Sequence, residues 1–318
     1  MRQFTMGSLL YICYMKQIFI FFILYLCLGL LASCDNNSIE QPAYLNIQEL
    51  FMSPSPNLPY GNSSSKISSV WIKVNNNNLG AFELPVEIPV LIDNDGSYDL
   101  KMEPGIDING VSTFRGIYPF YKPIELSIDL KKGETIDLPI GSNKIVSYNF
   151  NAPQGDLQIK SLETFESGVS TLSTTNQSDT NWILTSDSNI KFPPPQGEEN
   201  VYSGMDILDT GICKFEVSSI DNFVLPKGGE NVYLEFDYHT TNPLTIGVIA
   251  INPGQIIQMP TATFLPNSEW NHGYVNFITE VSGSPQASSF KIFMGSAKLN
   301  NGILDTVLID NVRLLYYE

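Results

Sequence analysis

The chain has few cysteines and few histidines, and this limits the chemistry that it can carry out. Its 318 residues include four cysteines and two histidines. Three of the cysteines lie at or before position 34, so Cys213 alone falls in the body of the chain, where no intrachain disulfide can form. Because Cys213 lies in an apolar, strand-like run, we interpret it as a small buried residue.

Basic residues are also scarce. The sequence has 17 lysines and arginines against 33 aspartates and glutamates. From Cys34 to Glu318 there are 15 basic and 33 acidic residues, a net charge of −18. Such a surface repels phosphate backbones and anionic lipids. We therefore expect no nucleic-acid partner and no electrostatic binding to a membrane surface.

Several catalytic motifs are missing. No glycine-rich phosphate loop precedes a helix, no helical His-Glu pair suggests zinc, and no Gly-x-Ser-x-Gly elbow is present. The sequence therefore assigns no catalytic residue, and we do not expect an enzyme.

The one long apolar run lies near the N-terminus. It follows Met15-Lys16 and extends from Ile18 to Leu30. A short basic start, an apolar stretch and small residues before a cut describe a secretory signal peptide, whereas a membrane-spanning helix needs ~20 apolar residues. We interpret residues 1–33 as this signal, with Met15 as the true start of the protein. An uncleaved signal anchor is the alternative.

The residues Leu31-Ala32-Ser33-Cys34 resemble the lipobox of bacterial lipoproteins. This resemblance implies cleavage before Cys34 and lipidation of that cysteine, which would attach the protein to a membrane. Asp35 beside Cys34 resembles the acidic residues found in Bacteroidota-like surface lipoproteins, although in some other bacteria it resembles a signal for retention at the inner membrane. We expect a location in the cell envelope, at the outer membrane or the cell surface.

The remaining sequence predicts an all-β protein with two β-sandwich domains. Short alternating runs are separated by turn residues, and no apolar stripe of helical period appears. We expect a lipidated tether at residues 34–42, a small sandwich at 43–150 and a second sandwich at 157–318.

The first block contains three pairs of alternating runs joined by turn-forming residues. These pairs, each predicted as a hairpin or a turn back, are 70–74 with 79–84, 88–92 with 97–102, and 124–130 with 135–140. The pattern resembles a small prealbumin-like β-sandwich, a kind of adaptor domain in exported bacterial proteins.

The second block has five strand-like segments in a distinctive order. They are residues 164–168, 233–238, 269–277, 289–295 and 306–314. Their order and spacing resemble the jelly-roll domains of carbohydrate-binding modules, which are related to galactose-binding-like domains. This resemblance implies a jelly roll with a glycan ligand.

One predicted strand, residues 232–239, has two faces of different character. Val232, Leu234, Phe236 and Tyr238 alternate on an apolar face, which we assign to the core. We expect the opposite face to lie at the surface and to contact a glycan, because carboxylates and imidazole can bind sugar hydroxyls while an aromatic ring packs on the sugar. The candidate ligand-binding residues are Tyr233, Glu235, Asp237 and His239 on this face, with Trp182 as the tryptophan most exposed to solvent. A plain solvated strand face is the alternative.

A structural calcium ion is the one cofactor that the sequence suggests. Glu166 lies near the first predicted strand of the jelly roll and Asp310 near its last. In the modules that this block resembles, carboxylates at the terminal strands hold calcium, which prefers oxygen ligands. Asp310-Asn311 is also a good turn or bulge pair, which would need no metal.

Three functions remain open at this point. The leading hypothesis is non-catalytic binding of a glycan at the cell envelope. The alternative is a structural or adhesion subunit of an outer-membrane assembly that recognises protein. The weakest is a hydrolase whose site cannot be seen in one sequence. Glu235 and Asp237 could approach the spacing of a glycosidase carboxylate pair, but no second element indicates a cleft.

Overall fold

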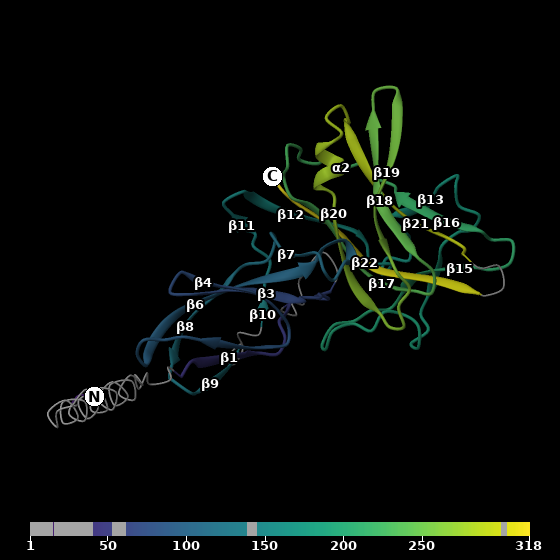
Figure 1. The fold of residues 1–318 in the computed structure, drawn as a ribbon. Coiled ribbons are helices and arrows are strands. Elements are labelled where there is room, and N and C mark those ends of the chain that lie inside the picture. The colour runs from purple at the N-terminus through teal and green to yellow at the C-terminus, as the bar shows by residue number, and fades with distance from the viewer. Residues whose placement is uncertain (1–14, 16–40, 53–61, 139–144, 300–303) are drawn as a thin grey trace, which may run out of the picture. The chain divides into compact units, whose positions relative to one another are not determined.

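The computed structural model describes residues 15, 41–52, 62–138, 145–299 and 304–318 (Figure 1). Apart from residue 15, the predicted signal peptide lies outside these residues, as do Cys34 and most of the predicted tether. Ala43–Glu318 forms one compact unit. Within the part of the chain that is described, no helix combines the length and the apolar character that a membrane crossing requires.

The chain is all-β, as predicted, and its first block is a small sandwich of sheets. One sheet has the strand order β4-β3-β6-β7 with β8 also paired to β6, another is β5-β1-β9, and β10 pairs with β2. The elements are β1 Ala43–Ile47, β2 Phe51–Met52, β3 Ser69–Val74, β4 Asn77–Glu83, β5 Val86–Val90, β6 Gly96–Asp107, the 3-10 helix η1 Ile108–Gly110, β7 Arg115–Ile117, β8 Ile124–Leu130, β9 Thr135–Leu138 and β10 Ile145–Val146. Alternation in these strands buries one face, with Leu45 and Ile72 fully enclosed.

Of the two hairpins predicted in this block, one is correct and one is wrong. β3 pairs with β4 around Asn75 and Asn76, whose φ angles of 46° and 64° lie in the left-handed region that asparagine tolerates. β5 does not pair with β6, because β5 pairs with β1 while β6 pairs with β3, β7 and β8. Likewise β8 pairs with β6, whereas β9 runs parallel to β1. The turn residues at these two places carry the chain from one sheet to the other.

The second block is a jelly-roll sandwich of two larger sheets. One sheet has the order β11-β12-β22-β15-β14, with β17 also paired to β22 and β20 to β17, and the other has the order β13-β16-β21-β18-β19. The elements are β11 Asn151–Ala152, β12 Gly155–Glu163, β13 Leu172–Thr174, β14 Ile183–Thr185, β15 Ser203–Leu208, β16 Lys214–Ser219, β17 Val232–Thr240, β18 Leu244–Asn252, β19 Gln255–Phe264, β20 Asn271–Asn276, α2 Ile278–Ser282, β21 Ser289–Ala297 and β22 Asp305–Tyr317. β18 and β19 form the long hairpin in Figure 1.

Four of the five predicted segments fall on strands of this block, namely β17, β20, β21 and β22. The predicted opening segment, 164–168, is wrong as a strand, because β12 ends at Glu163 and a turn follows it. Cys213 is also misassigned, since it is exposed rather than buried.

The two faces of β17 are both buried. Val232, Leu234, Phe236 and Tyr238 lie in the core between the two sheets, as predicted. The opposite face packs against the first block, whose Tyr118 and Phe120 rings meet the Tyr233 ring edge-on at 5.3 Å and 5.8 Å between centroids. Strand β17 therefore has no broad solvated face.

Candidate functional site

The predicted ligand-binding face of β17 forms a buried polar network between the two blocks. The expectation that this face is open to solvent is wrong for three residues: Tyr233 is 4% exposed, Glu235 0% and Asp237 1%. The register explains why these side chains meet. β17 pairs with β20 so that Asp237 lies opposite His272, and with β22 so that Glu235 lies opposite Arg313.

Glu235 accepts three contacts from buried donors. Tyr118 donates its hydroxyl to Oε1 and Tyr148 donates to Oε2, each at 2.6 Å. The Arg313 guanidinium lies 3.2 Å from Oε2. Burial raises the pKa of both tyrosines well above the usual value, so their hydroxyls stay protonated and can donate. Both carboxylate oxygens of Glu235 are therefore engaged by donors inside the protein.

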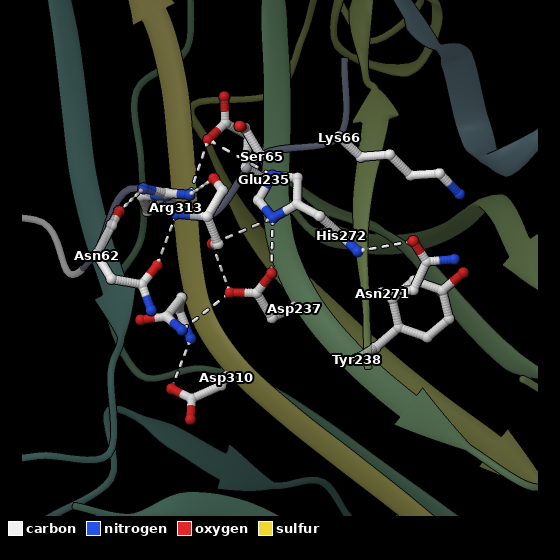
Figure 2. Close-up of polar contacts among 12 residues, drawn as sticks. Asn62, Ser65, Lys66, Glu235, Asp237, Tyr238, Asn271, His272, Asp310 and Arg313 are labelled. Atoms are coloured by element: carbon white, nitrogen blue, oxygen red, sulfur yellow. Dashed lines mark hydrogen bonds and ion pairs between the residues drawn. The ribbon is translucent and has the colours of Figure 1, made fainter. Parts of the chain in front are cut away.

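Asp237 is held in the same way by three other side chains (Figure 2). Its Oδ1 lies 2.7 Å from Nδ1 of His272, and its Oδ2 accepts hydrogen bonds from Ser64 at 2.6 Å and from Asn311 at 2.9 Å. A buried carboxylate needs such partners, because leaving it unpaired costs several kcal/mol. Ser64 belongs to the first block, so this carboxylate links the two blocks.

The arrangement of serine, histidine and aspartate here differs from that of a serine hydrolase. In such enzymes the serine and the aspartate contact opposite nitrogens of the imidazole. Here Ser64 Oγ lies 3.3 Å from Nδ1 of His272, the same nitrogen that Asp237 contacts. The other nitrogen, Nε2, is buried without a hydrogen bond and lies 3.9 Å from Glu235. His272 therefore cannot activate Ser64 as the general base of such a triad does.

The two predicted calcium ligands hold one loop from two sides. Glu166 is exposed, and its Oε1 accepts hydrogen bonds from the backbone amides of Val201 and Tyr202 at 2.8 Å and 3.1 Å. Asp310 is fully buried and accepts from Ser203 at 2.5 Å and from Asn200 at 3.1 Å.

No group of three or more His, Cys, Asp or Glu residues that could hold a metal occurs among the described residues. Calcium binding by Glu166 and Asp310 stays a prediction. Burial raises the pKa of Asp310 to about 8. A proton rather than a metal ion can therefore neutralise its carboxyl group at neutral pH.

The remaining predicted residues lie in three different settings. Tyr233 accepts a hydrogen bond from Asn276 at 2.9 Å inside the protein. Trp182 packs edge-on against Phe215 with centroids 4.7 Å apart, and its indole nitrogen is buried, so it is not an open surface tryptophan. His239 is half-buried, and the centroid of its ring lies 6.3 Å from that of Trp270. Trp270 lines the pocket described next.

A pocket of about 630 Å³ opens above the Asp237–His272 pair. We call it the Trp270 pocket. Its lining residues come from both blocks and are Phe51, Met52, Ser63, Ser64, Ser65, Lys66, Phe192, Pro193, Pro195, Gln196, Asp237, Trp270, Asn271 and His272. Of the predicted ligand-binding residues, Asp237 is the one that lines this pocket.

The aromatic side chains of the Trp270 pocket are held by neighbouring groups. Trp270 donates its indole N–H to the carbonyl of Ile190 at 3.0 Å and meets Phe192 edge-on at 5.3 Å. Phe51, which also lines the pocket, is 37% exposed. Prolines add flat, apolar surface beside these rings. The polar lining comes mainly from Ser63, Ser64 and Ser65 of the first block, which we call the polar wall, with Asn271 and Gln196 from the second block.

Sequence reasoning missed Ser64, Trp270 and His272 as site residues. A signal for His272 was present, because His272 and Tyr274 alternate along β20 and must share a face, whereas Trp270 lies just before that strand. Ser64 carried no comparable signal, since it lies far from the jelly roll in the sequence and outside any strand.

No protein-family model matches the chain, and no curated protein matches it. Solved structures that match it include a carbohydrate-binding module of the β-sandwich superfamily studied for promiscuous specificity, with 12% identity over 86% of this chain and 99% of that chain and a TM-score of 0.36. The xylan-binding domain CBM22-2 of Paenibacillus barcinonensis Xyn10C matches with 12% identity over 48% of this chain and 97% of that chain, at a TM-score of 0.34.

A third match is the enzymatically active domain of tailspike protein 4 from bacteriophage CBA120. It has 14% identity over 45% of this chain and a TM-score of 0.34, and this chain spans only 19% of that chain. Several neighbours are thus carbohydrate-binding modules, but at these TM-scores the likeness supports no inference about function.

Proposed function

We propose that this protein is a non-catalytic lipoprotein of the cell envelope that binds a glycan in the Trp270 pocket. The observation that carries this proposal is the composition of the pocket walls. The aromatic and proline surfaces of Trp270, Phe192 and Pro193 line the same cavity of about 630 Å³ as serine, asparagine and glutamine side chains. A cavity of this size is within the range of about 300–1,000 Å³ that small-molecule ligands occupy.

Sugars match this division of surfaces. The C–H faces of a pyranose are apolar and stack on aromatic rings, whereas its hydroxyls need neutral donors and acceptors. The one carboxylate among the described residues that line the pocket, Asp237, is held by His272, Ser64 and Asn311. The walls therefore offer mostly neutral polar groups to a ligand, with Lys66 as the one lysine or arginine among them.

The same contacts support a binding role without catalysis. Glu235 is buried in its pairing with Arg313 and does not line the pocket, so Glu235 and Asp237 do not form a carboxylate pair in a cleft. Ser64 and Asp237 share one nitrogen of His272, which does not match a hydrolase triad.

A glycan array probed with the detergent-solubilised mature protein tests the binding proposal. The Phe51→Ala variant should weaken binding of any glycan found by about tenfold, the scale of one lost aromatic contact. The matched control is Phe114→Ala, since Phe114 is 56% exposed and does not line the pocket. An array without hits, or equal losses in the two variants, would contradict the proposal.

The location at the envelope rests on Cys34. Metabolic labelling with a fatty acid should label the wild-type protein and leave the Cys34→Ser variant unlabelled. Protease treatment of intact cells should then cleave the protein if it lies at the cell surface. Wild-type protein without label would refute the lipoprotein assignment, and glycan binding would be judged separately on the array.

One observation favours the alternative, recognition of a partner protein. No charged residue occurs between Thr240 and Ser268, in a chain of net charge −16, and Ile256 in this stretch is 71% exposed on edge strand β19. Uncharged edge strands can pair with another chain. Crosslinking in cells through a photoreactive residue at position 256 should capture one defined protein if this alternative holds.

A further inference from the structure

One wall of the Trp270 pocket belongs to the first block and is held in place by a residue near the opposite end of the chain. The segment Asn62–Lys66, which contains this wall, has no strand pairing of its own. Arg313 on β22 donates from Nη1 to the carbonyl of Asn62 at 2.7 Å and from Nη2 to the carbonyl of Ser64 at 3.2 Å. Figure 2 shows the guanidinium between Asn62 and Glu235.

The geometry of the guanidinium suits this task. Its planar fork presents donors in fixed directions, so one group can hold two carbonyls and a carboxylate together. Glu235 supplies that carboxylate, 3.2 Å from Nη2, and Arg313 is only 1% exposed. A lysine ammonium would keep the charge but could not reach the same partners with the same geometry.

Other contacts complete the attachment of the wall. Ser64 donates to Asp237 at 2.6 Å, and the backbone amide of Lys66 donates to the Tyr274 hydroxyl at 3.1 Å. Each partner lies on the jelly roll. The serines that face a ligand therefore occupy their positions only when the two blocks are joined.

We infer that the Trp270 pocket is a composite site and that Arg313 is its positioning residue, although Arg313 does not line the pocket. The inference rests on the proposed function for its ligand, a glycan. Arg313 fixes the polar wall before the ligand arrives, so the binding free energy is not spent on ordering Asn62–Lys66. Ligand affinity therefore depends on a residue that never touches the ligand.

Hydrogen exchange on the full mature protein tests this without a ligand. In Arg313→Lys, amides of residues 62–66 should exchange at least roughly tenfold faster, because the hydrogen bonds from the guanidinium to the wall are lost. The control is Arg115→Lys, which alters an arginine paired with Glu83 and Asp107 in the first block. That variant should leave exchange at residues 62–66 unchanged.

A second variant guards against a folding defect. Removing one member of a buried ion pair leaves the other charge buried and unpaired, whereas replacing both members with neutral groups can leave the fold intact. The double variant Glu235→Gln with Arg313→Met should therefore fold and still show fast exchange at residues 62–66. Unchanged exchange in both Arg313 variants would overturn the inference.

Affinity for a glycan identified on the array separates this inference from the proposed function. Arg313→Lys should bind at least about tenfold more weakly than wild type, through the reordering cost of the wall. Fast exchange with unaltered affinity would overturn the positioning role. A third outcome is that wild type binds no glycan while amide exchange at residues 62–66 still rises in Arg313→Lys. In that case the proposed function fails, and the positioning of the wall by Arg313 stands.

Discussion

Raising the pH from about 5 to about 7 should weaken the folded state through Asp310. This carboxyl group is fully buried on β22, and burial raises its pKa from the ordinary value of 3.8 to about 8. Between these two values the folded protein holds a proton that the unfolded chain releases. The stabilisation is complete below the lower value and is lost as the pH rises through the higher one.

The size of the effect follows from proton linkage. Within that window one extra bound proton changes the free energy of unfolding by about 1.4 kcal/mol per pH unit. Two pH units inside the window therefore correspond to a loss of about 3 kcal/mol, a large fraction of the 5–15 kcal/mol typical of a domain.

Urea unfolding of wild type and Asp310→Asn measures this contribution. Asparagine does not titrate, so the difference between the two proteins isolates Asp310 from every other group. Between about pH 5 and pH 7, the free energy of unfolding of wild type should fall by about 3 kcal/mol more than that of the variant. Equal pH dependence of the two proteins would refute the reasoning, and a calcium-dependent rise in wild-type stability with pH would show that the carboxylate is ionised on a metal ion.

Three further predictions concern other parts of the molecule. Tyr118→Phe removes a donor from buried Glu235 and should lower the free energy of unfolding by about 1–3 kcal/mol in urea titrations, with an unchanged midpoint contradicting the hydrogen bond. Cys213 is exposed, so a thiol reagent should titrate one free thiol per native chain when Cys34 carries lipid; no reaction before denaturation would refute the exposure. Calcium should raise the melting temperature if the two predicted carboxylates bind it, and identical melting curves in calcium and in chelator would reject that site.

Much of the site could be anticipated from the period-two pattern of single strands. The pattern in β17 correctly separated the core face of Val232 and Leu234 from the polar face of Glu235 and Asp237. It could equally have placed His272 and Tyr274 on one face of β20. Alternation depends only on the pleat of the backbone, which each strand carries by itself.

The contacts of those faces could not be anticipated. Turn chemistry correctly gave the β3–β4 hairpin, but similar turns after β5 and β8 lead into a different sheet. The pocket depends on the register that puts His272 opposite Asp237 and on the first block that brings Ser64 to them. Neither is encoded locally.

The sequence by itself determined an all-β chain, its strand faces and its acidic, nearly cysteine-free character, because these depend on composition and on neighbours along the backbone. Tertiary structure alone decided that the polar face of β17 is buried, since another block covers it, and that Arg313 meets Asn62 across 251 positions of sequence. Burial and charge pairing are set by whatever segment arrives from elsewhere in the chain, and that choice is made by the free energy of the whole fold.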